Sequence, residues 1–227
     1  MLYSLHEIIS HVRVLLNYSP DCKPLIDVRD EPTLSINRII ATMLPTAAQQ
    51  VLLTAPLAAI DTLRPLTGKL CWKQQLEENM TSGLQIPMNP MNEKHQLAMA
   101  FLPLPDDFLR LASIQLSDWQ RPAHIISEES PEYDLQTSRF PGVRGNPQRP
   151  VAAIVRYSFG LVAELYSSFL GEDVTIRKAL YVPQPHLDAD RCIDLPKSLF
   201  HDIMQRVAEM TINSPLTPFQ SSILNFQ

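Results

Sequence analysis

The segment His186-Leu187-Asp188-Ala189-Asp190 carries three side chains of the types that bind metal ions, at alternate positions. On an extended backbone, alternate side chains point to the same side, and carboxylate oxygens suit a divalent cation. A fourth ligand is not identifiable in the sequence. We therefore favour a polar loop between a strand and a helix. A small metal-dependent hydrolase that uses His186, Asp188 and Asp190 is kept as an alternative hypothesis.

Arginines in a proline-rich segment offer a second kind of chemistry, the binding of anions. Arg139, Arg144 and Arg149 recur every five residues in SRFPGVRGNPQRP, and Arg121 lies upstream. The planar guanidinium group suits phosphate and carboxylate partners. The pattern is compatible with contact to DNA, with contact to an acidic surface of a neighbouring subunit, and with a solvated loop.

One acidic pair and the cysteines point less clearly to a particular chemistry. Neighbouring side chains of a strand point to opposite faces, so Asp106 and Asp107 cannot form the carboxylate pair of a glycosidase by themselves, and we expect them in a turn. Cys22, Cys71 and Cys192 are odd in number, widely spaced and include no CxxC. The sequence therefore indicates neither a disulfide framework nor a zinc site, and it is consistent with a reducing compartment.

Motifs of the common enzyme classes do not occur. The sequence has no GxxxxGK[ST], GxGxxG, HExxH or GxSxG, and its 6 glycines leave little material for a loop that surrounds a phosphate. We expect no catalytic activity, and we expect no metal or other cofactor.

Composition favours a soluble globular protein with rigid connections. In 227 residues, 45% are hydrophobic and 19% are charged, which excludes collagen-like, coiled-coil and wholly disordered chains. The 20 prolines, about 9% against an average near 5%, stiffen loops and end helices and strands. A net charge of −5 does not favour nucleic acid or an anionic membrane. Neither a signal peptide nor a membrane span is predicted.

Apolar residues at intervals of three and four predict a helix near each end of the sequence. The first should end near Pro20, and the last should begin around Pro196 and end before Asn213. The first stripe comprises Leu2, Leu5, Ile9, Val12 and Leu16. The second comprises Leu199, Ile203, Val207 and Met210.

A further helix is predicted after residue 32. Thr33 or Ser35 can act as its N-cap. Pro45 should end or kink it, because the residue before a proline disfavours the helical conformation. A separate helical piece should then run from Thr46 to about Thr54.

The central part of the sequence is predicted to be rich in strands. Strands are expected at 98–102, 108–116, 151–159, 161–169 and 174–182. The period of two along 174–182 favours an antiparallel sheet. The connection 117–150 is rich in proline, and we expect a long extended arm with at most one short strand near His124.

Helices outside a block of strands predict an α+β fold, since strands do not alternate with helices. It should comprise N-terminal helices, a central antiparallel β-sheet with a long extended arm, and a C-terminal helix with an extended tail. We divide the sequence into a helical region at 1–97, a β-rich region at 98–192 that includes the loop 117–150, a helix at 193–212 and a tail at 213–227. We expect one domain overall.

Two segments carry a resemblance to a known family, FLPLPDDFLRLASIQL at 101–116 and IDLPKSLFHDIMQRVAEM at 193–210. With the opening pair of helices, they resemble the head-to-tail adaptor proteins of short-tailed bacteriophages, also called tail tubular or connector ring proteins. The shared features are a strand entered through Leu-Pro and acidic residues, and a late helix led by Leu-Pro. The resemblance covers most of the sequence, apart from 56–97 and 117–150.

The resemblance implies a structural, non-enzymatic virion protein that assembles in the host cytoplasm into a homo-oligomeric ring, twelve-fold by analogy. Such a ring would bind the portal protein and other tail or ring proteins. It would surround the channel through which genomic DNA passes during ejection, without sequence-specific binding and without a membrane.

Subunits of a ring meet through heterologous contacts, in which one patch meets a different patch of the next copy. We expect these contacts at the arm 117–150 and at the tail 213–227. The residues expected there are Arg139, Arg144, Arg149, Phe219 and Phe226. The alternatives are the metal-dependent hydrolase and a monomeric binding module.

Overall fold

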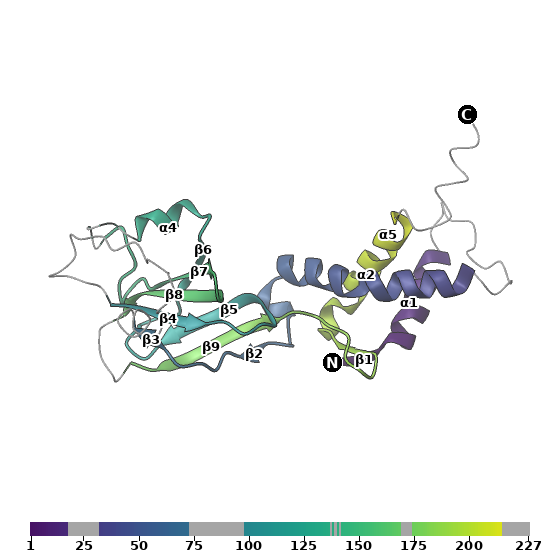
Figure 1. Ribbon diagram of the computed structural model, residues 1–227, viewed down its shortest axis with the longest axis horizontal. Coiled ribbons are helices and arrows are strands. Elements are labelled where there is room, and N and C mark those ends of the chain that lie inside the picture. Colours follow the sequence, from purple (N-terminus) through teal and green to yellow (C-terminus); the bar gives the residue numbers. More distant parts are fainter. Residues whose placement is uncertain are drawn as a thin grey trace, which may run out of the picture. The chain divides into compact units, whose positions relative to one another are not determined.

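The computed structural model confirms an α+β fold. It describes residues 1–17, 32–72, 98–136, 138, 140, 142–168 and 174–214. The chain divides into two compact units, unit 1 with Met1–Leu63 and the chain from Val182 onward, and unit 2 with Arg64–Tyr181 (Figure 1). This division differs from the single domain expected from the sequence, and its first boundary falls inside the helical region predicted for 1–97. Among the described helices, none combines the length and hydropathy that a membrane crossing requires.

Unit 1 is built from three helices, α1 (Leu5–Asn17), α2 (Pro32–Thr54) and α5 (Phe200–Ile212). The predicted last helix is thereby confirmed, and α5 packs against both α1 and α2. Short 3-10 turns lie at Leu57–Ala59 and Lys197–Leu199. The buried core includes Ile8, Val12, Leu16, Ile40, Leu44, Ile203, Met204 and Val207.

A short strand precedes the first helix. β1 (Leu2–Ser4) pairs antiparallel with β10 (Cys192–Asp194), so the helix begins after this strand and the prediction that placed Leu2 on its stripe is wrong. The Ser4 hydroxyl accepts a hydrogen bond from the backbone N–H of Glu7 at 3.3 Å, and the Glu7 carboxylate accepts one from the backbone N–H of Ser4 at 3.0 Å. This reciprocal capping box determines where the helix starts.

Helix α2 continues through Pro45, contrary to the prediction that the proline ends or kinks it into two pieces. A proline in a helix interior costs about 3 kcal/mol, whereas burial of one leucine side chain contributes about 1.5–3 kcal/mol. Buried side chains around the proline are Leu44, Ala47, Ala48 and Leu52. The free energy gained by burying these side chains outweighs the cost of a proline in the helix interior. The helix begins at Pro32, and the side chains of the predicted caps Thr33 and Ser35 lie outside the described residues.

Unit 2 contains two sheets, with strand orders β3-β4-β8-β7-β6 and β2-β9-β5. Their bounds are β2 (Arg64–Pro65), β3 (Cys71–Trp72), β4 (Ala98–Pro103), β5 (Phe108–Leu116), β6 (His124–Ser127), β7 (Val151–Tyr157), β8 (Gly160–Ser168) and β9 (Ile176–Pro183). The predicted strands are present. β4 and β5 lie in different sheets, so the turn between them connects two layers. The larger sheet is mixed and not purely antiparallel, because β6 pairs parallel with β7.

The five-stranded sheet is covered on both faces. One face shares a hydrophobic core with the three-stranded sheet, to which β5 contributes Phe108 and Ile114. On the other face, Ile126, Ala153 and Val155 pack with Tyr133 of the short helix α4 (Pro131–Leu135). Figure 1 shows α4 on one side of unit 2 and the strands β2 and β9 on the opposite side.

The segment 117–150 is not an extended arm over its described length. Trp119 is buried, and β6 and α4 follow it. The hydroxyl of Ser130 accepts a hydrogen bond from the backbone N–H of Glu132, and Pro131 stands at the start of the helix. A capping serine followed by proline is a helix start signal, which explains why a turn of helix interrupts the predicted arm.

Candidate assembly surface

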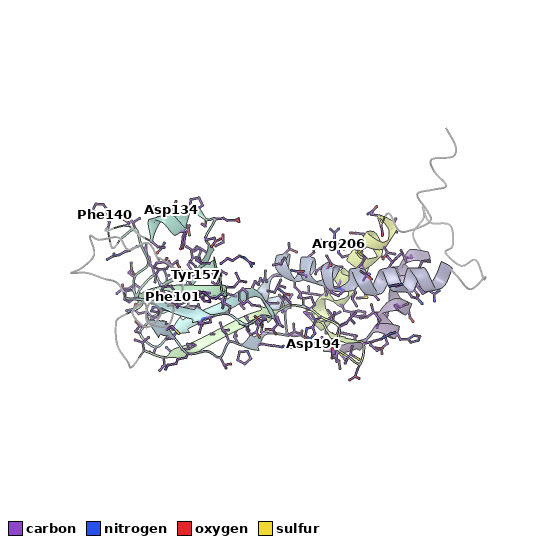
Figure 2. All side chains as sticks on the ribbon, viewed as in Figure 1. Phe101, Asp134, Phe140, Tyr157, Asp194 and Arg206 are labelled. Carbon is purple, nitrogen blue, oxygen red and sulfur yellow. The ribbon has the colours of Figure 1, made fainter. Side chains whose placement is uncertain are left out.

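A buried carboxylate lies beneath helix α4. Glu164 of β8 is only 2% exposed, and three tyrosine hydroxyls donate hydrogen bonds to its carboxylate. The donor oxygen of Tyr133 is 3.0 Å away and that of Tyr166 is 2.6 Å away, and Tyr157 contributes the third bond. Figure 2 labels Tyr157 at the end of β7. The cluster joins α4, β7 and β8 through one acidic side chain.

The tyrosines are held in their neutral form. Burial, followed by the negative charge of Glu164, raises the pKa of Tyr133 from 10.0 to about 12. The pKa of Tyr157 and that of Tyr166 are also raised, with burial again the largest cause and Glu164 the next. Neutral hydroxyls are the form that donates to a carboxylate. The cluster therefore stabilises the attachment of α4 to the sheet.

This cluster is absent from the sequence-based predictions, although a signal for it exists. Val162, Ala163 and Leu165 are buried on alternating faces of β8, which is typical of a strand covered on both sides. A glutamate within such an apolar run, followed two residues later by Tyr166, indicates a buried acid that needs hydrogen-bond donors.

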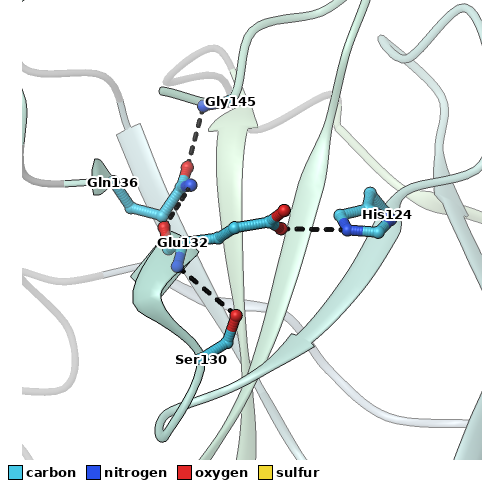
Figure 3. Close-up of polar contacts among 5 residues, drawn as sticks. All are labelled: His124, Ser130, Glu132, Gln136 and Gly145. Carbon is cyan, nitrogen blue, oxygen red and sulfur yellow. Dashed lines mark hydrogen bonds and ion pairs between the residues drawn. The ribbon is translucent and has the colours of Figure 1, made fainter. Parts of the chain in front are cut away.

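A second network holds α4 and the loop that follows it (Figure 3). The imidazole Nε2 of His124 is 3.0 Å from a carboxylate oxygen of Glu132. The amide of Gln136 donates to the carbonyl of Glu132 at 2.9 Å and accepts from the backbone N–H of Gly145 at 2.8 Å. A Cβ at Gly145 would lie only 3.2 Å from the Cβ of Tyr166, so this close approach favours glycine. We call the described residues of 128–149 the α4 lobe.

The α4 lobe exposes large apolar side chains. Leu135 is 45% exposed, Phe140 is 59% exposed and Val143 is 47% exposed. Nine large apolar residues are exposed among those that the structure describes, and three of them lie within 135–143. Figure 2 shows Phe140 near the helix that carries Asp134. This is a concentration of apolar surface on an element that is held in place.

The same lobe is acidic. Its acidic residues Glu128, Glu129, Glu132 and Asp134 are exposed, and they outnumber its described cationic residues, the half-buried Arg144 and the exposed Arg149. The α4 lobe therefore presents both apolar and negatively charged groups.

Of the predicted contact residues, the structure describes two arginines. Arg144 is half-buried in the α4 lobe, and its Nε is buried without a hydrogen-bond partner. Arg149 is exposed, and its backbone N–H donates to the carbonyl of Asn146 at 2.8 Å. Residues outside the described ranges are Arg139, Phe219 and Phe226. The predicted contacts at the tail therefore remain predictions.

The candidate metal segment forms an exposed loop. His186, Asp188 and Asp190 are all exposed, and the backbone N–H of Arg191 donates to the carbonyl of Asp188 at 3.0 Å in a turn. Within the described ranges, no three His, Cys, Asp or Glu side chains gather into a group that could hold a metal ion. The segment is a polar loop as expected, but it connects the strands β9 and β10 and not a strand and a helix. The hydrolase stays an alternative hypothesis.

The acidic pair forms the predicted turn, and Asp107 adds a structural role. Its carboxylate accepts hydrogen bonds from the guanidinium of Arg64 at 3.0 Å and from the hydroxyl of Tyr181 at 2.9 Å, which connects the turn to β2 and β9.

Cys71 and Cys192 are free and half-buried. Cys22 lies outside the described residues.

No protein-family model matches this chain, and no curated protein is similar enough in sequence to count as a match. The resemblance to the phage adaptors therefore depends on its two segments. Segment 101–116 forms the end of β4, the turn and β5, and segment 193–210 forms the end of β10, a 3-10 turn and most of α5.

Proposed function

We propose that this protein is a structural subunit that self-associates through the α4 lobe, as a ring-forming head-to-tail adaptor of a bacteriophage virion. The observation that carries the proposal is the exposure of Leu135, Phe140 and Val143 on a lobe held by two hydrogen-bond networks. Contiguous exposed apolar patches mark protein interfaces, and in this proposal the three side chains form one.

The attachment of the α4 lobe to the sheet should increase its affinity for a second copy of the chain. Ordering a loose segment on binding costs free energy, and a surface that is already ordered avoids this cost. Burial of a leucine or phenylalanine contributes about 1.5–3 kcal/mol, so three such side chains supply a useful centre for an interface. The Glu164 cluster thus supports assembly indirectly, because it orders the surface that a neighbour would cover.

In the proposed assembly, the ring lies between the portal protein and other tail proteins and surrounds the channel for genomic DNA. The identity of these neighbours follows from the resemblance of 101–116 and 193–210, and twelve-fold symmetry is an analogy. A net charge of −5 is compatible with a channel through which DNA slides, since a strongly cationic lumen would bind the backbone.

The test is the solution mass at several protein concentrations, by light scattering after size exclusion, alone and with phage portal rings. We expect wild type to form multi-subunit species or to bind portal rings, and the variant L135S/F140S/V143S to lose at least about tenfold in association. Leu57→Ser is the matched control, because Leu57 is an exposed apolar residue of unit 1. Circular dichroism verifies folding. A wild type that stays monomeric at every concentration and ignores portal rings would refute the proposal.

A further inference from the structure

A groove of about 870 Å³ lies between the segment 65–70 and strand β9. β2 pairs with β9 only at Arg64 and Pro65, and the last backbone hydrogen bond between the described segments runs from Leu66 N–H to the carbonyl of Ala179 at 2.9 Å. Beyond it the segments diverge. The start of β9 therefore borders an open groove.

The groove is cationic with an apolar interior. Lys69, Arg177 and Lys178 line it and are exposed, and none of the lining residues that the structure describes is acidic. Leu70 and Ile176 also line it and pack against the core of unit 2. A partner for this groove should therefore carry negative charge together with apolar side chains.

The α4 lobe has this combination of properties. Glu129, Asp134 and Leu135 are all exposed in it, and the stretch 127–136 has no cationic side chain. The lobe covers one face of the five-stranded sheet, whereas the groove belongs to the layer of β2 and β9 (Figure 1). One copy of the chain therefore carries the two complementary surfaces on opposite layers of unit 2.

We propose that the cationic groove receives the acidic α4 lobe of a second copy of this chain. The inference rests on the proposed function, since it names the surface that the lobe meets. Because the lobe and the groove differ, the contact is heterologous, and repetition closes into a ring or continues as a filament.

Charge reversal on each surface tests the proposal. K69E/K178E reverses the groove and E129K/D134K reverses the lobe. Each variant alone should lose about tenfold or more in association at low ionic strength, because like charges then face each other. In an equimolar mixture every groove again meets a lobe of opposite charge, so the mixture should return to within about threefold of wild type. Lys197→Glu and Asp202→Lys, at exposed positions of unit 1, are the matched controls.

Cross-linking of the wild-type chain gives a second readout that does not depend on the folding of a variant. A zero-length carbodiimide reagent is applied to a mixture of copies of natural and heavy nitrogen isotope composition. Bonds between copies are expected from Lys69 or Lys178 to Glu129 or Asp134. Their absence from an assembled wild type would overturn the inference.

The remaining outcomes separate the two proposals. If the apolar variant L135S/F140S/V143S dissociates while K69E/K178E assembles normally, the groove inference is wrong and the assembly proposal stands. If K69E/K178E assembles normally but loses binding to single-stranded DNA, the groove is a nucleic-acid site and the inference is wrong. A wild type that neither self-associates nor binds portal rings overturns both.

Discussion

Glu164 shows how a single buried acid is accommodated. A carboxylate without partners in a protein interior is costly, and three hydroxyl donors offset that cost here. The donors come from α4, β7 and β8, so the same bonds that satisfy the charge also connect these elements. Replacing one tyrosine removes one hydrogen bond. Replacing Glu164 with an apolar residue leaves three hydroxyl groups without their acceptor.

The tyrosines around Glu164 predict a loss of stability at alkaline pH. The pKa of Tyr133 is about 12 in the folded chain and 10.0 for an ordinary tyrosine, so the folded state holds its proton more tightly. This contribution is fully present below pH 10 and is lost as the pH rises toward 12. We expect the free energy of unfolding to fall over this window, as measured by denaturant unfolding at each pH.

Glu164→Gln is the control for this prediction. It removes the negative charge but keeps the burial of the tyrosines, so their ionisation, followed by phenolate absorbance, should move toward lower pH than in wild type. Identical titration curves for wild type and variant would contradict the role of Glu164.

At the scale of elements, helices and strands that depend on neighbouring residues are predicted correctly, whereas pairings between distant segments are not. The stripe of α5 and the pair of strands β7 and β8 depend on neighbouring residues, and they are read correctly from the sequence. The sequence does not show that β6 pairs parallel with β7, or that β4 and β5 lie in separate sheets, because such pairing depends on distant segments.

The candidate surface was predictable only in part. The prolines and arginines of 117–150 led us to predict contacts there, and this segment contains the α4 lobe. Arg144, which we predicted as a contact residue, is half-buried, whereas Leu135 and Phe140 are exposed. The exposed fraction of a side chain depends on which other segments pack against it. Residue types and their spacing do not contain this information.

Helix α2 yields a prediction about its internal proline. Pro45→Ala restores a backbone donor to the helix, and we expect it to stabilise unit 1 by about 1–2 kcal/mol after the greater freedom of the unfolded chain is subtracted. Pro56→Ala is the control, because Pro56 lies outside α2, at the N-cap of the 3-10 turn Leu57–Ala59, and it should destabilise by up to about 1 kcal/mol. Denaturant unfolding followed by helical circular dichroism measures both. A destabilised Pro45→Ala would show that the helix needs the proline.

At the scale of the whole molecule, assembly should respond to salt in a graded way. Raising the ionic strength from about 0.1 M to 1 M shortens the Debye length from about 10 Å to 3 Å, which screens the lobe and the groove from each other. The apolar side chains Leu135 and Phe140 are not screened. We expect the mass from sedimentation to fall with salt but to stay above that of the monomer. Association that strengthens with salt would indicate a purely apolar contact.

The division into two units also bears on how the chain folds as the ribosome makes it. Unit 2, Arg64–Tyr181, is an insertion between the two segments of unit 1. β1 pairs with β10, and α1 and α2 both pack against α5, so these segments emerge long before the strand and the helix that complete unit 1. Unit 2 has all of its described strands by then. The inserted unit is therefore complete first, and the two ends of the chain join last, after residue 212 has been synthesised.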